Sequence, residues 1–363
     1  MTVPDTMTAA LLLGNGGPEM LEVRDDVPVP QPAADEVLIA VGACGMNNTD
    51  INTRVGWYSK TVTAGTAGEG YAAVGDDDTT WGGSGLSFPR IQGADICGQV
   101  VAVGADANDS LMGRRVLVDP WIRDSDHPLD RELAGYLGSE RDGGFAQYAT
   151  APARNVHTVE SSLTDAELAT FACSSSTAEH MLSRASVGEG ETVVVTGASG
   201  GVGSALVQLA RRRGARVVAV AGQVKLEVVA ELGADAVVAR EGAELHAAVA
   251  AAADAPVDVV ADVVGGPDFA GWLDLLRRGG RYVTAGAIAG PVVELDLRTL
   301  YLDDLSLFGA TVFPPGLFAD LVGYIERGEI RPLLAGTYPL AEIHDAQEAF
   351  TMKQHLGNLV LVP

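Results

Sequence analysis

The sequence predicts an α/β protein of two domains, in which a doubly wound parallel sheet is joined to a β-rich, partly open barrel. Three observations support this prediction. The 363 residues exceed the usual size of one domain, the first part consists of short β-like runs, and from Glu191 onward apolar strands alternate with helices. We expect the β-rich domain to comprise residues 1–165 and 313–363, and the parallel sheet to lie within residues 166–312.

The first part of the chain contains short apolar and β-branched runs that Gly, Pro and Asp interrupt. Such closely spaced runs indicate a mostly antiparallel, barrel-like domain. The expected strands are residues 9–13, 36–41, 99–103, 115–118 and 145–149.

The second part alternates strands and helices. Residues 192–196 form a continuous β-branched run, and residues 202–213 follow with apolar side chains at helical spacing. Fully apolar strands joined by helices predict a parallel sheet that is covered on both faces. Further strands are expected at 216–221, 236–239, 257–264 and 282–285, with 305–312 as a sixth, and helices at 225–232, 243–253 and 269–278. Residues 316–363 then predict helix, strand, helix and a last strand at 359–362 that returns to the first domain.

Composition excludes several classes of partner. The chain has 48 acidic and 24 basic residues and a net charge of −24, so it repels phosphate backbones and anionic lipids. We therefore expect neither nucleic acid nor a membrane as partner, and no apolar run approaches the roughly 20 residues that span a bilayer. Three cysteines are too few for a disulfide framework, and the start of the chain lacks a signal-peptide pattern. A cytoplasmic location is expected.

A glycine-rich segment follows the strand at 192–196. It reads Ala198-Ser199-Gly200-Gly201-Val202-Gly203 and opens the next helix, which is the dinucleotide fingerprint with Ala in the first glycine position. Gly200 lets the backbone approach a pyrophosphate, Gly203 lets the helix pack on the strand, and the helix N–H groups point at the anion. Glycine-rich turns also serve as plain connections, but the strand before and the strand units after favour a cofactor site.

The end of the second strand of this sheet bears on the choice of cofactor. An NAD site usually has an acidic residue there, whereas this chain has Gly222, Gln223 and Lys225 and no carboxylate. Lys225 could pair with the 2′-phosphate of NADP(H), or it could be a solvated lysine at a helix start. The missing acid favours the first alternative, so NADP(H) is the predicted cofactor.

Three motifs carry a family resemblance that covers nearly the whole chain. They are G-M-N-N-T-D at 45–50, R-V-G-W-Y at 54–58 and P-R-I-Q-G-A-D at 89–95. With the fingerprint, they make the chain similar to the medium-chain dehydrogenase/reductase superfamily, and most of all to its quinone oxidoreductase branch. This resemblance implies a GroES-like catalytic domain and a Rossmann cofactor domain.

The resemblance also bears on zinc. The alcohol dehydrogenase branch of the superfamily binds a catalytic zinc through Cys, His and Cys, and those positions fall on Asn47, Ala94 and Cys173. One cysteine cannot supply the three protein ligands of a catalytic zinc. The sequence therefore predicts no metal site.

Without zinc, hydrogen-bond donors must stabilise the oxyanion that develops on the acceptor. By resemblance, Asn47 is the main candidate, Thr49 occupies the proton-relay position of the zinc branch, and Tyr58 lies near the nicotinamide. Asn47 and Thr49 could instead cap a helix that starts near Asp50. One departure from the quinone oxidoreductase pattern is Asn52, where that branch often has a tyrosine.

The resemblance implies further cofactor contacts at Thr177, Val264, Gly286, Ala287 and Asn358. Val264, Gly286 and Ala287 follow from the fold as well, because ligands bind at the carboxyl ends of parallel strands. Asn358 stands where the family often has a basic residue.

The resulting expectation is an NADPH-dependent oxidoreductase that transfers hydride to a quinone or an α,β-unsaturated carbonyl. An enoyl-thioester reductase or an alcohol dehydrogenase-like enzyme of the same superfamily is an alternative, and a non-catalytic NADP(H)-binding protein with a structural or regulatory role is another. The strand at 305–312 would be an exposed sheet edge, so we expect a homodimer. Residues 57–89, with Asp76–Asp78 near their centre, are either a surface insertion or a lid.

Overall fold

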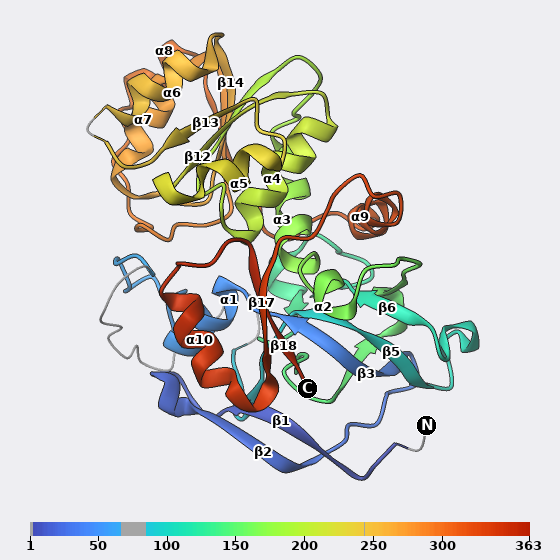
Figure 1. Cartoon of the computed structure of the whole chain (residues 1–363). Helices are drawn as coiled ribbons and strands as arrows, with labels where there is room; N and C mark the ends of the chain where they lie inside the picture. Colours follow the sequence, from blue (N-terminus) through green and yellow to red (C-terminus); the bar gives the residue numbers. More distant parts are fainter. Residues whose placement is uncertain (1–2, 67–84, 243) are drawn as a thin grey trace. The chain divides into compact units, whose positions relative to one another are not determined.

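The computed structural model describes residues 3–66, 85–242 and 244–363 (Figure 1). Contacts within the chain define two compact units. The β-rich unit comprises Met1–Val62, Glu69–Cys173 and Pro314–Pro363, and the parallel-sheet unit comprises Thr63–Gly68 and Ser174–Phe313. The unit boundaries thus follow Cys173 and Phe313, whereas the expected domain boundaries follow residues 165 and 312. Asp76–Asp78 and most of the 57–89 insertion lie outside the described residues.

The parallel-sheet unit is built on one six-stranded sheet with the order β13-β12-β11-β14-β15-β16. Every neighbouring pair is parallel. Counted from the first strand of the unit, this order is 3-2-1-4-5-6, as in doubly wound dinucleotide-binding sheets. The expected fold class is confirmed. The strands are β11 (Thr192–Val195), β12 (Arg216–Ala221), β13 (Ala236–Ala239), β14 (Val257–Asp262), β15 (Leu276–Thr284) and β16 (Ser306–Gly309).

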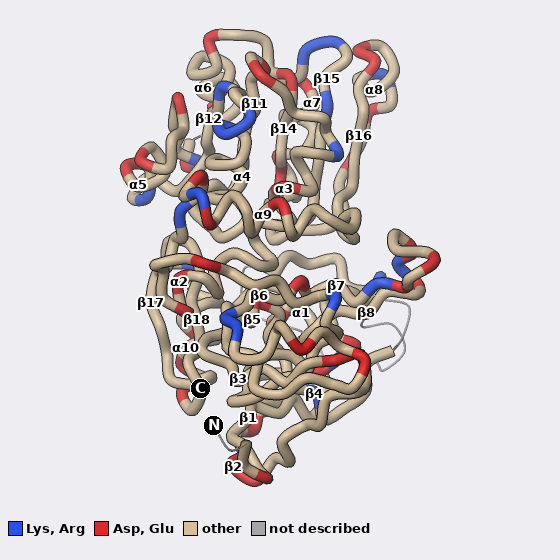
Figure 2. Tube along the Cα trace, turned by 90° about the vertical axis from the view of Figure 1, so that its right-hand side faces the viewer, with Lys and Arg blue, Asp and Glu red and all other residues tan. Residues whose placement is uncertain are grey.

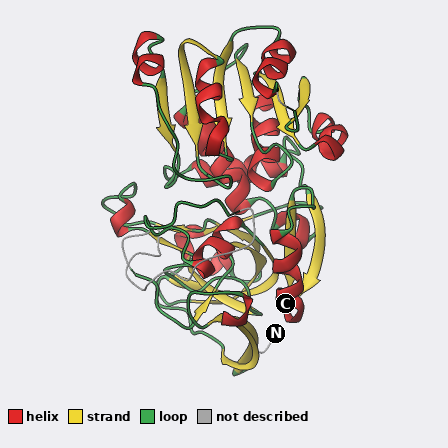
Figure 3. Ribbon diagram, turned by 90° about the vertical axis from the view of Figure 1, so that its left-hand side faces the viewer, coloured by secondary structure: helices red, strands yellow, loops and turns green. Residues whose placement is uncertain are grey.

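Helices connect these strands and lie on both faces of the sheet (Figure 3). Because both faces are covered, the central strands consist mainly of buried Val and Ala. Part of the core consists of Val194, Val218, Val260, Phe269 and Trp272, and burial of each such side chain contributes about 1.5–3 kcal/mol. The helices are α3 (Ala172–Arg184), α4 (Gly201–Arg212), α5 (Leu226–Glu231), α6 (Leu245–Ala253), α7 (Phe269–Asp274) and α8 (Leu297–Leu302).

Several element boundaries in this unit differ from the prediction. The helix expected at 269–278 ends at Asp274, and β15 begins at Leu276 because Leu276 already pairs with Val257. The strand expected at 257–264 ends at Asp262, whose carboxylate accepts the N–H groups of Val264 and Gly265 in place of a neighbouring strand. The sixth strand is shorter than the predicted 305–312.

The β-rich unit is mostly antiparallel, as predicted. Its main sheet has the order β10-β6-β5-β3-β18-β17, and β9 also pairs with β3. Smaller sheets are formed by β2-β1-β4 and by β7-β8. The strands are β1 (Thr6–Leu12), β2 (Leu21–Pro28), β3 (Glu36–Gly45), β4 (Arg90–Ile91), β5 (Asp95–Val103), β6 (Arg115–Val118), β7 (Trp121–Ile122), β8 (Gly135–Tyr136), β9 (Tyr148–Pro152), β10 (Val156–Thr158), β17 (Leu334–Pro339) and β18 (Asn358–Val362).

One strand of this unit is displaced from its expected position. Residues 145–149 are predicted as a strand, but β9 starts at Tyr148. Phe145 donates its N–H to Gln92 and accepts the N–H of Ala10, so this segment bonds to other neighbours before β9 begins.

The last strand, β18, enters the main sheet between β3 and β17. It runs antiparallel to β3, with Val360 opposite Gly45 and Leu361 opposite Cys44. The expected return of the chain to the first domain is therefore present. The helices of this unit are α1 (Asn48–Val55), α2 (Asp165–Leu168), α9 (Leu317–Glu326) and α10 (Ile343–Thr351).

Charged residues are distributed over both units, and acidic ones are the more frequent (Figure 2). Among the described residues, no helix combines the length and the apolar character that crossing a bilayer requires.

Candidate functional site

The turn between β11 and α4 has the geometry that the fingerprint predicts. Gly197 has a φ of +58°, a conformation that favours glycine. A Cβ atom on Gly203 would lie 2.1 Å from the carbonyl oxygen of Gly197, so only glycine lets α4 approach the turn this closely. A Cβ atom on Gly200 would meet only that same oxygen, at 3.6 Å. The protein itself therefore does not require glycine at position 200, whereas a ligand approaching the backbone would.

The start of α4 carries the remaining residues of the fingerprint. Gly200 is the N-cap residue and Gly201 the first residue of the helix, and no side chain caps this end. Ser199, Gly201 and Val202 are half-buried. The first N–H groups of a helix have no partner within the helix and attract anions. These residues can thus hold a pyrophosphate with backbone groups alone.

The ends of β12 and β13 bring two cations and one carboxylate together. Gly222, Gln223 and half-buried Lys225 follow β12, and Arg240 and Glu241 follow β13. One carboxylate oxygen of Glu241 accepts the N–H of Gln223 at 2.9 Å, and the other accepts Nε of Arg240 at 3.1 Å. Burial and, next, the positive charge of Arg240 lower the pKa of Lys225. Two like charges are therefore held near each other.

Arg240 and Glu241 are absent from the sequence-based set of site residues. The sequence-based prediction expects an acid only at the end of the second strand, β12. Glu241 follows the third strand, β13, and its side chain extends to the end of β12. The adjacency of β12 and β13 in a 3-2-1 sheet is the signal that could have found both residues.

The ends of β14 and β15 lie beside each other at the same edge of the sheet. Val264, Gly286 and Ala287 are half-buried. A Cβ atom on Gly286 would lie 3.1 Å from the carbonyl oxygen of Val263, and the carbonyl of Val264 accepts the N–H of Ala289 at 2.9 Å. Thr177 is half-buried in α3 of this unit.

The beginning of the 57–89 insertion contacts this region. The N–H of Thr66 donates to the carbonyl of Ile288 at 2.9 Å, in the loop that follows β15.

The predicted catalytic residues lie in the β-rich unit, at the start of α1 and just beyond its end. Asn47 is the N-cap residue of α1, and its N–H donates to Oδ2 of Asp50 at 2.7 Å. Thr49 is half-buried within the first turn. The capping alternative is therefore realised for Asn47, although its side-chain amide remains available for a second role.

The Asn47 side chain faces a buried acid. Its interaction lowers the pKa of Asp95, but burial dominates and raises that pKa from 3.8 to about 7. Oδ1 of Asp95 accepts the N–H of Cys173 at 2.8 Å. Nδ2 of Asn47 and Oδ2 of Asp95 are both buried, and neither makes a hydrogen bond of normal geometry. A buried amide donor without a partner is costly, so this group is suited to an acceptor that arrives with a ligand.

Tyr58 lies after α1 and is half-buried. Nδ2 of Asn52 donates to the Tyr58 hydroxyl at 3.5 Å. Asn52, which stands where the quinone oxidoreductase branch often has a tyrosine, thus contacts Tyr58. Burial raises the pKa of Tyr58, which keeps its phenol protonated and able to donate.

Asn358, the remaining predicted cofactor residue, belongs to the β-rich unit. It is buried at the start of β18, and its Nδ2 donates to the carbonyl of Thr170 at 2.9 Å. At least one of its amide hydrogens is thus used within the protein.

Family models match two stretches of the chain. Residues 33–161 match the alcohol dehydrogenase GroES-like domain, and residues 201–327 match the zinc-binding dehydrogenase family. The quinone oxidoreductase of Lama guanicoe is 30% identical, over 93% of this chain and 91% of its own length. A solved protein of Sinorhizobium meliloti, provisionally named an alcohol dehydrogenase, is 51% identical with a TM-score of 0.90, over 99% of this chain and 98% of that one.

The chain belongs to the medium-chain dehydrogenase/reductase superfamily. Its quinone oxidoreductase relatives place it with the quinone oxidoreductase-like members, as the motifs predict. It is an oxidoreductase of this superfamily, whose members bind nicotinamide cofactors on a Rossmann-type fold. Another solved member, a 2-octenoyl-CoA carboxylase reductase in complex with NADP and 2-octenoyl-CoA, is 26% identical with a TM-score of 0.84, over 99% of this chain and 88% of that one.

The residues at the zinc-ligand positions of the superfamily do not fit the metal. Asn47, Ala94 and Cys173 offer one thiol among three positions, and zinc requires about three nitrogen, sulfur or carboxylate ligands from the protein. Within the described part of the chain, no group of three or more His, Cys, Asp or Glu side chains is arranged to hold a metal ion.

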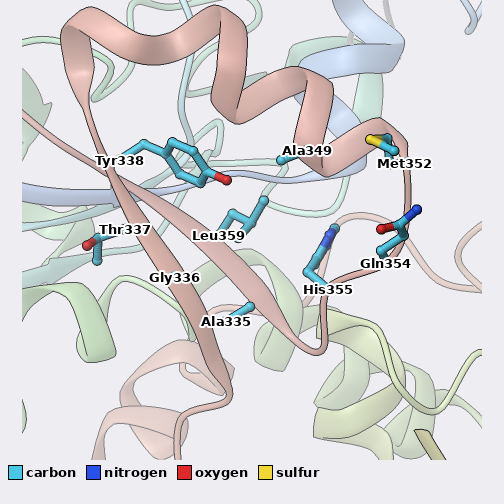
Figure 4. A pocket seen from close by; sticks show the side chains of 9 residues that line it. All are labelled: Ala335, Gly336, Thr337, Tyr338, Ala349, Met352, Gln354, His355 and Leu359. Atoms are coloured by element: carbon cyan, nitrogen blue, oxygen red, sulfur yellow. The ribbon is translucent and has the colours of Figure 1, made fainter. Parts of the chain in front are cut away.

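The β-rich unit also has a hollow of about 300 Å³ between β17, β18 and the end of α10 (Figure 4). Tyr338, Gln354, His355 and Leu359 are among its lining residues. The residues predicted for catalysis or cofactor binding are not part of this lining.

Proposed function

We propose that this oxidoreductase transfers hydride from NADPH to a quinone or an α,β-unsaturated carbonyl, without a metal ion. The β11–α4 turn is the main support for the proposal. Packing within the protein requires glycine at position 203 but not at position 200, where a ligand that approaches the backbone would require it. Bound NADPH would supply the hydride. The chain must then hold the cofactor and polarise the acceptor.

The cations near the end of β12 support NADPH over NADH. Lys225 and Arg240 both carry positive charges, and the charge of Arg240 helps to lower the pKa of Lys225. Both oxygens of Glu241 already accept hydrogen bonds, from Gln223 and Arg240. A 2′-phosphate would relieve the repulsion between the two cations and accept charge-assisted hydrogen bonds from both.

Asn47 is the group we assign to the acceptor. Its buried Nδ2 faces Asp95 but makes no hydrogen bond of normal geometry, and an amide donor of this kind stabilises the negative charge that develops on a carbonyl oxygen during hydride transfer. The helix cap fixes the backbone of Asn47, so the amide needs little reorganisation. We propose Tyr58, whose phenol stays protonated, as a second hydrogen-bond donor to the same oxygen.

The metal-free part of the proposal rests on the donor set. With Asn47 and Ala94 in place of a thiolate and an imidazole, the polarising role passes to hydrogen bonds. Metal analysis of the dialysed protein tests this, and one equivalent of zinc would contradict it.

A substrate panel run with NADPH and NADH in parallel tests the function. We expect quinones and enones to be reduced with NADPH, and Lys225→Ala to raise the KM for NADPH about tenfold, as for the loss of one charge-assisted bond. Lys60→Ala is the matched control, because it removes an exposed lysine of the β-rich unit. Activity with enoyl thioesters or alcohols only would instead favour those enzymes, and NADPH binding without any turnover would favour a non-catalytic protein.

We also propose a homodimer formed along β16, which is the edge strand of its sheet. Leu307 on this strand and Tyr301 and Leu302 on α8 are exposed apolar side chains that a second copy would cover. Sedimentation at micromolar concentration tests this, and a monomer would contradict it.

A cytoplasmic location is proposed because Cys44, Cys97 and Cys173 form no disulfide. The net charge of −24 supports the proposal that neither nucleic acid nor a membrane is a partner.

A further inference from the structure

Asp262 is a buried carboxylate at the carboxyl edge of the parallel sheet. It is not part of the fingerprint at 198–203, and the proposed hydride transfer assigns it no role. It is the last residue of β14 and is fully buried. Oδ1 accepts the hydroxyl of Thr196 at 2.5 Å, and Oδ2 accepts the hydroxyl of Tyr282 at 2.5 Å. These two residues follow β11 and lie in β15, so the carboxylate joins the ends of three neighbouring strands.

The same carboxylate organises the loop after β14. Oδ1 accepts the N–H of Val264 at 2.8 Å, and both oxygens accept the N–H of Gly265, at 3.2 and 3.1 Å. The hydroxyl of Thr196 in turn accepts the N–H of Val263 at 3.1 Å. Three successive N–H groups are thus fixed by one carboxylate and one hydroxyl.

This loop adjoins the cofactor turn on one side and the loop after β15 on the other. A Cβ atom on Gly197 would lie 3.0 Å from Cγ2 of Val263 and 3.2 Å from Cγ2 of Val264. On the other side, the carbonyl of Val264 accepts the N–H of Ala289. The adenosine side, at Lys225 and the ends of β12 and β13, is not part of this network.

The sheet itself has other sources of stability. Ladder hydrogen bonds join β14 to β11 and β15, and the apolar core lies beneath them. Thr196 and Tyr282 donate to the carboxylate, and burial raises the pKa of Tyr282, so its phenol remains a donor. An acceptor with two oxygens is what four converging donor groups require.

We propose that Asp262 is a positioning residue that shapes the nicotinamide end of the cofactor site and does not influence the adenosine end. This inference rests on the proposed cofactor binding. It predicts that perturbing Asp262 separates the affinities for the two halves of the dinucleotide.

The test compares NADPH with 2′,5′-ADP, which lacks the nicotinamide half, by titration calorimetry on the full chain. Asp262→Asn keeps the size of the side chain but places an amide N–H₂ among groups that donate. We expect its NADPH affinity to fall about tenfold, as for one or two lost hydrogen bonds, while its 2′,5′-ADP affinity stays within about twofold. An equal loss for both ligands, or no loss for either, would overturn the inference.

Tyr282→Phe is the matched control. It removes one hydrogen bond from the same carboxylate but leaves the N–H groups of residues 263–265 bonded. We expect NADPH affinity within about twofold of the wild type, even where stability falls.

Thr196→Val covers the case in which Asp262→Asn does not fold. It releases the N–H of Val263 and should show the same selective loss of NADPH affinity. The proposed function is checked separately by the wild-type protein. If the wild type binds neither NADPH nor NADH, the cofactor proposal fails, whereas normal binding by both wild type and variants refutes the role of Asp262 alone.

Discussion

Alanine at Gly200 and at Gly203 should damage this protein in two different ways, although the residues belong to the same turn. At Gly203, the new Cβ atom would lie 2.1 Å from the oxygen and 2.6 Å from the carbon of the Gly197 carbonyl, and 2.8 Å from Cα of Ala198. All three are backbone atoms, so no side-chain rotation relieves the overlap. At Gly200 the Cβ atom has 3.6 Å to its nearest neighbour.

The magnitudes follow from these contacts. Overpacking of this kind costs about 1–3 kcal/mol and occasionally more, against a gain of about 0.5–1 kcal/mol for alanine inside a helix. We expect Gly203→Ala to lower the free energy of unfolding by about 1–2 kcal/mol. Gly200 has extended φ and ψ angles of −87° and 176°, which alanine adopts, so Gly200→Ala should cost less than about 1 kcal/mol.

Cofactor binding should respond differently. A methyl group on Gly200 occupies the space through which a pyrophosphate approaches the backbone, and we expect at least about a tenfold weaker affinity for NADPH. Calorimetric titration measures the affinity, and urea unfolding followed by circular dichroism measures the stability. Gly188→Ala is the control, because a Cβ atom there has no neighbour within 4 Å. Wild-type NADPH affinity in a folded Gly200→Ala variant would refute the assignment of this turn to the pyrophosphate.

Three further predictions concern the donor to the hydride acceptor, the recognition of the cofactor phosphate and the titration of buried Asp95. Asn47→Ala should lower kcat by about 10²–10³-fold, the usual effect of one lost oxyanion donor, and an unchanged kcat in steady-state assays would contradict the role of Asn47. Arg240→Ala should raise the Kd of NADPH about tenfold and leave that of NADH unchanged in parallel titrations; equal effects on both would disprove phosphate recognition. Because burial raises the pKa of Asp95 from 3.8 to about 7, its contribution to stability is fully present below pH 3.8 and is lost as the pH rises through about 7. Asp95→Asn should therefore flatten the decline of the urea midpoint between about pH 4 and 7, and an unaltered slope would count against a titrating Asp95.

The sequence predicts β11 to β14 well because they are short runs that consist mainly of valine and alanine. Such runs are buried on both faces and depend little on which strand lies next to them. The helix α3 is absent from the predicted elements, since its Ser174, Ser175 and Ser176 have weak helix propensity and their burial within the fold outweighs it.

Features that depend on neighbours distant in sequence are harder to predict. Phe145 belongs to an extended segment, but its partners are Ala10 and Gln92, which lie more than fifty residues away. Glu241 is not predicted, because the acid is expected at the end of β12 whereas Glu241 follows the neighbouring strand β13. Asp262 leaves a visible signal, because it and Asp258 are the two carboxylates in the otherwise apolar run 257–264, but only its four donor groups reveal what it does.

The place of β18 has a consequence for how the chain is made. Residues 358–362 fill the position between β3 and β17, yet the ribosome synthesises them after the entire parallel-sheet unit. The parallel-sheet unit can therefore complete its core while the nascent β-rich unit still exposes the backbone of β3 at Cys44 and Gly45. Closure of that sheet, next to the Asn47 cap, is then one of the last events of folding.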